Sequence, residues 1–473
     1  MFQPFVDPCA RGIIKAEPCP REVGRELPIP QRKFILSACV IASSMAFIDG
    51  SVLTVALPKL RAALDVDLAS VQWVINSYVL ALAALTLTGG ALSDAYGKAR
   101  ILLIGCLLFG AASAGCALSR SIGWLVAARV LQGIAAALLT PASLALIGAT
   151  YPKEERTAAI GVWAAASSLT SAAGPVLGGL LTERFGWQSV FWINPPLAVI
   201  TVVLLLKFAA ADQRVSRRFD VVGALIIACG LGALTWALSQ IGRAQAPVMA
   251  SITADATLIV LFVFSLACAG GYAIWERMTD HPMTPPRLAG NLDFVGLNVA
   301  TMLIYMGLSI MFFLLPFDLL DHRGLSATTA GLVFLPFALA VSLLSPYFGS
   351  LADKLGTRAM LIAGALGAAV AYTWMMFAHD RVLMVSVVAP QTMLGISFAL
   401  LIAPLTASVM SSVAPSDEGL AAGINNAASR VAQLVGVAIA AGLGALMSGY
   451  QFGLAVAAAA SAAGALAIAV IHR

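Results

Sequence analysis

Three charged residues stand deep inside long apolar stretches of the sequence: Asp49, Arg129 and Arg430. If those stretches cross a bilayer, each charge costs about 2.5–3.5 kcal/mol even on insertion scales, so each is a candidate for function. Burial favours the neutral form of an aspartate, and a nearby guanidinium favours its charged form. A carboxylate whose exposure alternates could therefore take up a proton on one side of a membrane and release it on the other.

Asp49 and Arg129 are predicted to lie at similar depth. Asp49 lies just past the middle of a helix predicted over residues 34–58, and Arg129 lies near the start of an oppositely directed helix predicted over 123–149. At a rise of about 1.5 Å per residue both fall in the outer half of the bilayer, within reach of an arginine side chain. We predict that Asp49 binds the proton and that Arg129, with Gln132, tunes it or organises the water around it. The alternative is a static ion pair that joins the two helices.

Arg430 allows two interpretations. It lies near Asn425 and Asn426 in the thirteenth predicted helix. It either binds an anionic group of a substrate, or it snorkels toward the cytoplasm or bonds to carbonyl groups in the bundle. That helix contains no acidic residue.

The composition identifies the class of protein. The chain has 473 residues, of which 60% are apolar and 11% charged, and its mean hydropathy is +0.92. Soluble domains carry about 25% charged residues. The apolar runs lack the alternation of outer-membrane barrels, so only helices remain to cross the bilayer. The sequence therefore predicts an all-α integral membrane protein, and its net charge of +5 gives no reason to expect nucleic acid.

The residues that enzymes and metal sites need are missing from the expected places. The four histidines lie in predicted loops or at the ends of predicted spans, and no H-E-x-x-H or G-x-x-x-x-G-K-[ST] sequence occurs. The seven cysteines include no C-x-x-C pair, so we assign neither a disulfide nor a metal. We therefore expect a protein that is not an enzyme, needs no cofactor and uses an ion gradient rather than ATP.

Hydropathy predicts fourteen membrane-spanning helices after a polar N-terminal tail at 1–33. Most lysines and arginines fall in the loops on the side of the N-terminus, which places both termini in the cytoplasm of a multi-pass inner-membrane protein. The predicted ranges are 34–58, 72–93, 101–119, 123–149, 157–182, 187–210, 220–241, 252–275, 292–318, 327–350, 357–379, 382–411, 419–446 and 451–471.

An internal repeat organises these helices. Residues 90–97 and 349–356 share the pattern G-x-L-x-D-x-x-G, each in the predicted loop after an even-numbered helix and eight helices apart. Two six-helix halves alone would place the repeat six helices apart. We therefore predict an N-terminal half at 34–210, a linker at 211–219, two additional helices within 220–275, a loop at 276–291 and a C-terminal half at 292–473.

These motifs resemble the major facilitator superfamily, and specifically its fourteen-helix drug:proton antiporter family. The repeat is followed by Lys98 and Arg100 or by Arg358, as in that superfamily's cytoplasmic signature. Further similar stretches run across most of the chain: Phe47 to Pro58, Ala128 to Ala136, Ala172 to Gly179, Trp187 to Pro196, Gly324 to Pro336 and Gly419 to Asn426. The stretch ending at Gly179 is the most discriminating, because it is characteristic of exporters.

The resemblance implies two sets of functional residues. One is a cytoplasmic gate of Gly90, Asp94, Gly97, Lys98, Arg100, Gly349, Asp353, Gly356 and Arg358. The other is an antiporter motif of Gly174, Pro175, Gly178 and Gly179, which would bend the fifth helix and seal the two halves against proton leak. The chain departs from the family pattern at Ala95, where a basic residue is usual, and at Thr170, where a glycine is expected.

The resemblance and the residues together predict a proton-coupled exporter of hydrophobic or amphiphilic small molecules, with substrate held between the halves. The alternatives are an exporter dedicated to one endogenous metabolite and, third, a proton symporter for uptake. We expect a monomer whose partners are substrate, protons and lipid, with an accessory adaptor protein left open. The residues we expect in the cavity are Trp73, Tyr78, Trp163, Tyr305, Phe312, Asn425 and Arg430.

Overall fold

The structure is a computed structural model that describes residues 28–209, 221–241, 256–279, 288, 290–378, 381–413, 418–444 and 449–471. Every regular element in these ranges is helical, which confirms the predicted all-α membrane class. Eleven of these helical segments are long and apolar enough to cross a membrane. The total of fourteen stays a prediction. The predicted linker and most of the tail at 1–33 lie outside the described residues.

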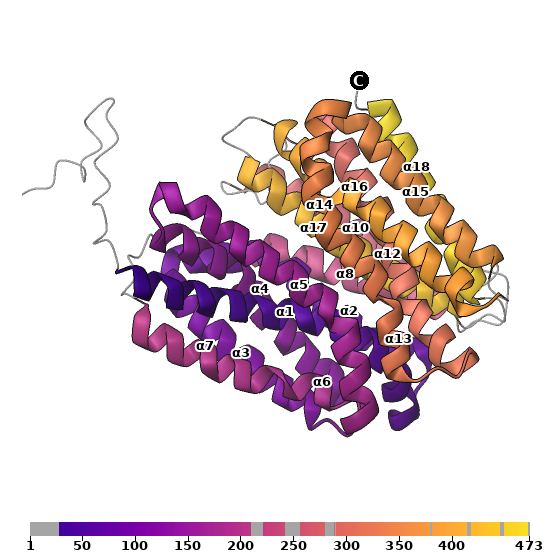
Figure 1. The fold of residues 1–473 in the computed structure, drawn as a ribbon, viewed down its shortest axis with the longest axis horizontal. Helices are drawn as coiled ribbons and strands as arrows, with labels where there is room; N and C mark the ends of the chain where they lie inside the picture. The colour runs from indigo at the N-terminus through magenta and orange to yellow at the C-terminus, as the bar shows by residue number, and fades with distance from the viewer. Residues whose placement is uncertain are drawn as a thin grey trace, which may run out of the picture.

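The N-terminal half forms one bundle. In Figure 1 it is drawn from indigo to magenta, with α1 beside α4 and α5, and α3 beside α7. Its helices are α1 (Ile29–Leu64), α2 (Leu68–Tyr96), α3 (Lys98–Ala117), α4 (Ile122–Thr150), α5 (Lys153–Phe185), α6 (Ser189–Trp192) and α7 (Asn194–Phe208).

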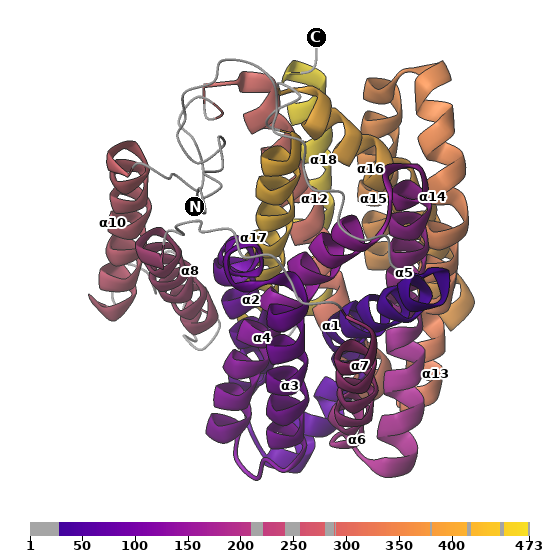
Figure 2. The same cartoon turned by 90° about the vertical axis from the view of Figure 1, so that its left-hand side faces the viewer.

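The C-terminal half forms a second bundle, and two further helices stand beside both. The two are α8 (Val221–Ile241) and α10 (Ala256–Met278); α8 packs against α2 and α17, on one flank of the molecule in Figure 2. The second bundle contains α12 (Leu292–Phe317), η2 (Asp318–His322), α13 (Ala327–Val333), α14 (Leu335–Leu355), α15 (Thr357–Phe377), η3 (Met384–Val388), α16 (Ala389–Ser411), α17 (Glu418–Gly444) and α18 (Gly449–Ile471).

Two predicted helices are each broken into two pieces. The range 187–210 contains α6 and α7, which separate at Ile193, just before Pro195 and Pro196. The range 327–350 contains α13 and the first part of α14, which separate at Phe334, two residues before Pro336. Proline lacks an N–H to continue a helix but is tolerated in a first turn, so the chain bends and starts again.

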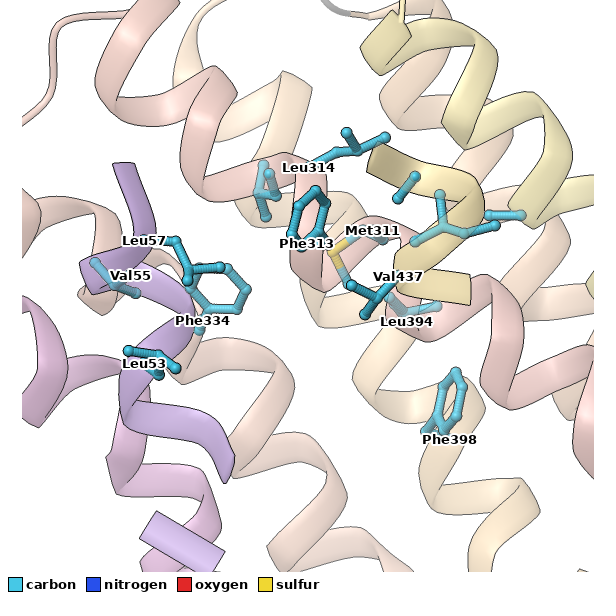
Figure 3. Packing of buried hydrophobic residues seen from close by; sticks show 14 of the residues in the cluster. Leu53, Val55, Leu57, Met311, Phe313, Leu314, Phe334, Leu394, Phe398 and Val437 are labelled. Atoms are coloured by element: carbon cyan, nitrogen blue, oxygen red, sulfur yellow. The ribbon is translucent and has the colours of Figure 1, made fainter. Parts of the chain in front are cut away.

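The two halves meet in an apolar contact. In Figure 3, Leu57 of α1 lies beside Phe334, and Phe313 and Met311 of α12 lie to the right of them in the same buried cluster. Lipid tails are as apolar as these side chains, so the contact is stabilised by close packing rather than by removal of apolar surface from water. Figure 1 shows the halves close together where α13 begins and leaning apart toward the other end.

Candidate proton site and substrate cavity

Asp49 is fully enclosed within the N-terminal half. Its carboxylate forms an ion pair with Arg129 of α4, and the two side chains are each 1% exposed. Gln132 donates from Nε2 to Asp49 Oδ1 at 2.8 Å, and Asn194 donates from Nδ2 to the same oxygen at 3.4 Å. Three helices, α1, α4 and α7, therefore meet at one carboxylate.

Arg129 is held by more than its acidic partner. Its Nε donates to the carbonyl oxygen of Val74 at 2.8 Å, and its Nη1 donates to Gln132 Oε1 at 2.9 Å. The guanidinium carbon lies 4.2 Å from the centre of the Tyr78 ring, which is a favourable cation–π geometry. A buried charge is tolerated only when it is paired and its remaining donors are bonded. The surroundings of Arg129 meet that requirement.

Asn194 was not predicted as a site residue. It begins α7 directly before two prolines, and the break between α6 and α7 carries it to Asp49. Its Nδ2 also lies 2.9 Å from Ser113 Oγ, and Ser113 in turn donates to the carbonyl of Phe191 at 2.8 Å. The signal in the sequence is an asparagine before two prolines inside an apolar run, where a polar group has to be bonded.

A second buried ion pair lies at the far end of α12 and was also missed. Asp318 accepts from Arg323 Nε at 2.8 Å, and Arg323 Nη1 donates to Ser386 Oγ at 2.9 Å. Asp318 is 1% exposed. Asp318 is the last residue of the helix predicted over 292–318, so the sequence does not single it out as an intramembrane charge.

A cavity of about 480 Å³ lies between the halves. Trp163, Tyr305, Phe312 and Arg430 line it, and a neighbouring cavity of about 250 Å³ is lined by Tyr78, Phe312 and Arg430. The remaining walls of the larger cavity are mostly aromatic rings and hydroxyl groups: Phe47, Ser51, Ser167, Ser171, Pro175, Leu308, Phe334, Phe337, Ala338, Val341, Ser342, Phe398, Ile402, Asn426, Ser429 and Gln433.

Two predicted cavity residues lie elsewhere. Trp73 lines neither of these two cavities; its ring packs edge-on against Trp236 of α8, at 6.4 Å between ring centres. Asn425 donates to Asn298 Oδ1 at 3.2 Å and to Thr301 Oγ1 at 2.8 Å, which ties α17 to α12. It borders a third space of about 290 Å³, which shares Tyr305 and Asn426 with the larger cavity. Helical periodicity alone did not reveal which neighbour each face would meet.

The glycines of α5 lie at its closest contacts. A Cβ at Gly174 would overlap the side chain of Ser51, and one at Gly178 would overlap the carbonyl of Val52, both on α1. A Cβ at Gly179 would overlap the carbonyl of Ala327 in α13, across the two halves. Thr170, where the family pattern has glycine, instead shares a hydrogen bond of 3.2 Å with Ser44 of α1.

Two polar contacts join the halves at the end where α5 finishes. Glu183 accepts from the backbone N–H of Thr328 at 2.8 Å, in the first turn of α13. Arg61, in the last turn of α1, pairs with Asp321 at 3.5 Å. In the predicted topology this is the outer end of the molecule, so the structure is closed there.

The family follows from comparison with known proteins. The family model of the Major Facilitator Superfamily matches residues 39–275 and 297–473. The chain belongs to the major facilitator superfamily.

Two similar proteins are resistance proteins, and a solved transporter has a similar fold. A multidrug resistance protein, Stp, of Mycobacterium tuberculosis is 32% identical over 403 residues, covering 84% of this chain and 72% of Stp. A puromycin resistance protein of Streptomyces alboniger is 31% identical, covering 87% of this chain and 82% of its own. The crystal structure of an auto-inhibited peptide transporter of the POT family has a TM-score of 0.68 at 18% identity, with 94% of this chain and 97% of that chain covered.

The superfamily's repeated signature lies on helices rather than in loops, which corrects the prediction. Residues 90–96 form the last turns of α2 and residues 349–355 the last turns of α14; only the final glycines leave the helix. Gly97 has φ of 101° and Gly356 has φ of 89°, a region that other residues rarely adopt. The two aspartates, Asp94 and Asp353, therefore lie near helix C-termini.

Beside the first signature the close helix contact is made by Gly89, one residue before the signature begins at Gly90. A Cβ at Gly90 would make ordinary contact with Pro141 at 3.7 Å, whereas one at Gly89 would overlap the carbonyl of Ala137. The side chains of Asp94 and Asp353 lie outside the described residues, so their gate role stays a prediction. Among the basic residues, Arg100 is exposed at the start of α3, Lys98 is half-buried, and Arg358 donates to the carbonyl of Ala469 in α18.

Proposed function

We propose that this protein is a proton-coupled exporter of hydrophobic or amphiphilic small molecules that works by alternating access. The observation that carries the proposal is the enclosed pair of Asp49 and Arg129 beside a central cavity. Tyr78 connects the ion pair to the cavity, because its ring lies over Arg129 and also lines the smaller cavity. A protonation event at Asp49 thus has a direct contact through which to reach the substrate.

The chemistry at Asp49 is an exchange of partners. When Asp49 takes up a proton, it loses its charge and its attraction to Arg129 weakens, whereas Gln132 and Asn194 can still bond to a neutral carboxyl. Arg129 then retains the carbonyl of Val74, the side-chain oxygen of Gln132 and the ring of Tyr78. The two protonation states favour different packing of α1 against α4, and a shift between them is what couples a proton to the conformation.

The direction of transport is proposed from the glycines of α5 and from the named relatives. The seal formed by α5 with α1 and α13 closes the outer end while the central cavity is present. Such a seal suits an exporter, which has to admit substrate from the inner side without leaking protons. Two relatives carry names that state multidrug and puromycin resistance. The alternatives, export of one endogenous metabolite and uptake by symport, remain testable.

The remaining parts of the proposal concern setting and partners. The protein spans the inner membrane with both termini in the cytoplasm. It works as a monomer in lipid, and the proton gradient is its energy source. No bound cofactor is needed for this cycle. The chain itself supplies the titratable group, the cavity and the seal.

The test uses the purified protein in proteoliposomes with an imposed pH gradient and dansylglycine, an amphiphilic fluorescent compound, as the first substrate. The wild type is expected to move dansylglycine against its gradient and to acidify the compartment that dansylglycine leaves. Asp49→Asn is expected to lose proton movement, whereas Asp293→Asn, an exposed acid in the first turn of α12, keeps it. Full proton coupling in Asp49→Asn would overturn the assignment. Sidedness is verified by protease access, so inward accumulation would instead indicate uptake.

A further inference from the structure

Arg430 gives the central cavity a positive charge that nothing in the described part of the chain neutralises. The guanidinium lines both cavities between the halves, and Nη1 contacts Gln433 Oε1 at 3.4 Å. None of the residues that line these cavities is an aspartate or a glutamate. No acidic side chain among the described residues forms an ion pair with Arg430.

Asp49 is already paired and is therefore not available to balance the charge of Arg430. Asp49 pairs with Arg129 and accepts hydrogen bonds from Gln132 and Asn194, and it is 1% exposed. That pair is closed off from the cavity and is neutral as a unit. The charge that a molecule in the cavity meets is therefore that of Arg430.

The position of Arg430 also argues against the alternatives considered from the sequence. It lies midway along α17, from Glu418 to Gly444, so its guanidinium stays at the depth of the cavity instead of reaching a helix end. Its hydrogen bond goes to a side-chain amide, not to a backbone carbonyl. Among the described residues Gln433 is the one hydrogen-bond partner of Arg430, so most of its five donors are not bonded within them.

We propose that Arg430 binds an anionic group of the exported molecule, a carboxylate, sulfonate or phosphate, while the aromatic walls hold an apolar body. The proposal rests on the proposed transport function and specifies its substrate class. A guanidinium matches such groups with two parallel hydrogen bonds, and away from water these bonds are stronger. Phe334 and Phe398, both labelled in Figure 3, belong to the apolar wall opposite the N-terminal half. A cation of the same size meets repulsion from Arg430 and finds no acid to pair with.

The test is equilibrium binding to the full-length protein in lipid nanodiscs at a fixed pH and without a gradient. Three probes share one fluorophore: dansylglycine carries a carboxylate, dansylamide is neutral, and dansylaminoethyl-trimethylammonium is a cation. The wild type is expected to bind dansylglycine about tenfold more tightly than the cation, since a charge-assisted bond is worth about that factor or more. Equal or tighter binding of the cation would overturn the proposal.

Variants separate charge recognition from folding. Arg430→Gln is expected to weaken dansylglycine binding by about tenfold and to leave dansylamide unchanged. Arg430→Lys keeps a positive charge and is expected to recover part of the loss. Arg277→Gln, which removes an exposed arginine on α10, is the matched control and is expected to change no probe. An equal loss for all three probes in Arg430→Gln would indicate a structural role instead.

A second variant keeps the test decisive if Arg430→Gln does not fold. Asn426→Asp places an acid of the same shape one helical turn from Arg430, on a residue that also lines the cavity. It is expected to weaken dansylglycine binding and to strengthen binding of the cation. Because the readout is binding without a gradient, full proton coupling in Asp49→Asn liposomes would overturn the proton assignment and leave this binding result standing. A negative binding result would in turn leave the proton assignment standing.

Discussion

The guanidinium of Arg129 lies over the ring of Tyr78, with its carbon 4.2 Å from the ring centre. Arg129 belongs to the enclosed ion pair, and Tyr78 belongs to the wall of a cavity that also contains Arg430. One aromatic ring therefore separates the proposed proton site from the proposed substrate site. A movement of Arg129 is therefore expected to move the Tyr78 ring and so to change the wall of the substrate cavity.

Replacing Tyr78 is expected to weaken the coupling between proton and substrate. Tyr78→Leu removes the ring, and the cation–π contact of a desolvated pair is worth about 2 kcal/mol, so proton movement per substrate should fall severalfold. Tyr78→Phe keeps the ring and loses only the 3.2 Å hydrogen bond from the hydroxyl to the carbonyl of Ala46. It is expected to remain coupled. The measurement is the ratio of proton flux to dansylglycine flux in proteoliposomes, and equal ratios in both variants would contradict the prediction.

Arg129 and Asp49 are expected to depend on each other for stability. Removing one partner of a buried pair leaves an uncompensated charge and costs about 3–5 kcal/mol. Arg129→Gln alone should therefore lower the thermal unfolding temperature in detergent strongly. The double variant with Asp49→Asn should be more stable than Arg129→Gln, because no charge remains buried. Additive losses in the two single variants and the double variant would mean that the pair is not coupled.

A side chain at Gly179 is expected to disturb the outer closure. Gly179→Leu collides with the backbone of α13 at Ala327, so the halves cannot approach there. We expect faster passive proton leak into liposomes and greater reactivity of a cysteine placed at the outer end. Gly161→Leu is the control on the same helix, because a Cβ at Gly161 meets nothing within 4 Å. If both variants leak alike, the glycine contact does not form the seal.

The outer contact through Glu183 is expected to depend on pH. Glu183 lies beyond the predicted span, and the hydroxyl and the backbone N–H of Thr328 lower its pKa from the ordinary value of 4.5. The carboxylate therefore favours the closed end above that ordinary pKa, and this contribution is lost as the pH falls below it through the lowered value. Outer cysteine reactivity should rise as pH falls through this window.

Glu183→Gln is the matched variant for that measurement. The amide oxygen can still accept the hydrogen bond from Thr328, but the side chain no longer titrates. Its cysteine reactivity should be flat over the same pH range. A wild-type rise that persists unchanged in Glu183→Gln would assign the pH dependence to another group.

The all-helical membrane class could be predicted because the apolar runs have the length that a bilayer requires, whereas helix ends differ from the predicted ranges: α1 runs over Ile29–Leu64 instead of 34–58. The meeting of Asp49 with Arg129 was also within reach, since depth follows from helix rise and direction. Asn194 was missed because its role depends on the break before two prolines. Trp73 was misplaced because hydropathy does not say which helix faces which, and its ring packs against Trp236 of α8.

The two additional helices make the flanks of the molecule unequal. On one flank α8 covers the line along which α2 and α17 meet, with α10 beyond it (Figure 2). On the opposite flank α5 meets α14 directly, and both helices contribute residues to the cavity wall, among them Trp163 and Ser342. A lipophilic molecule that diffuses within the bilayer therefore encounters a double layer of helix on one flank and a single layer on the other.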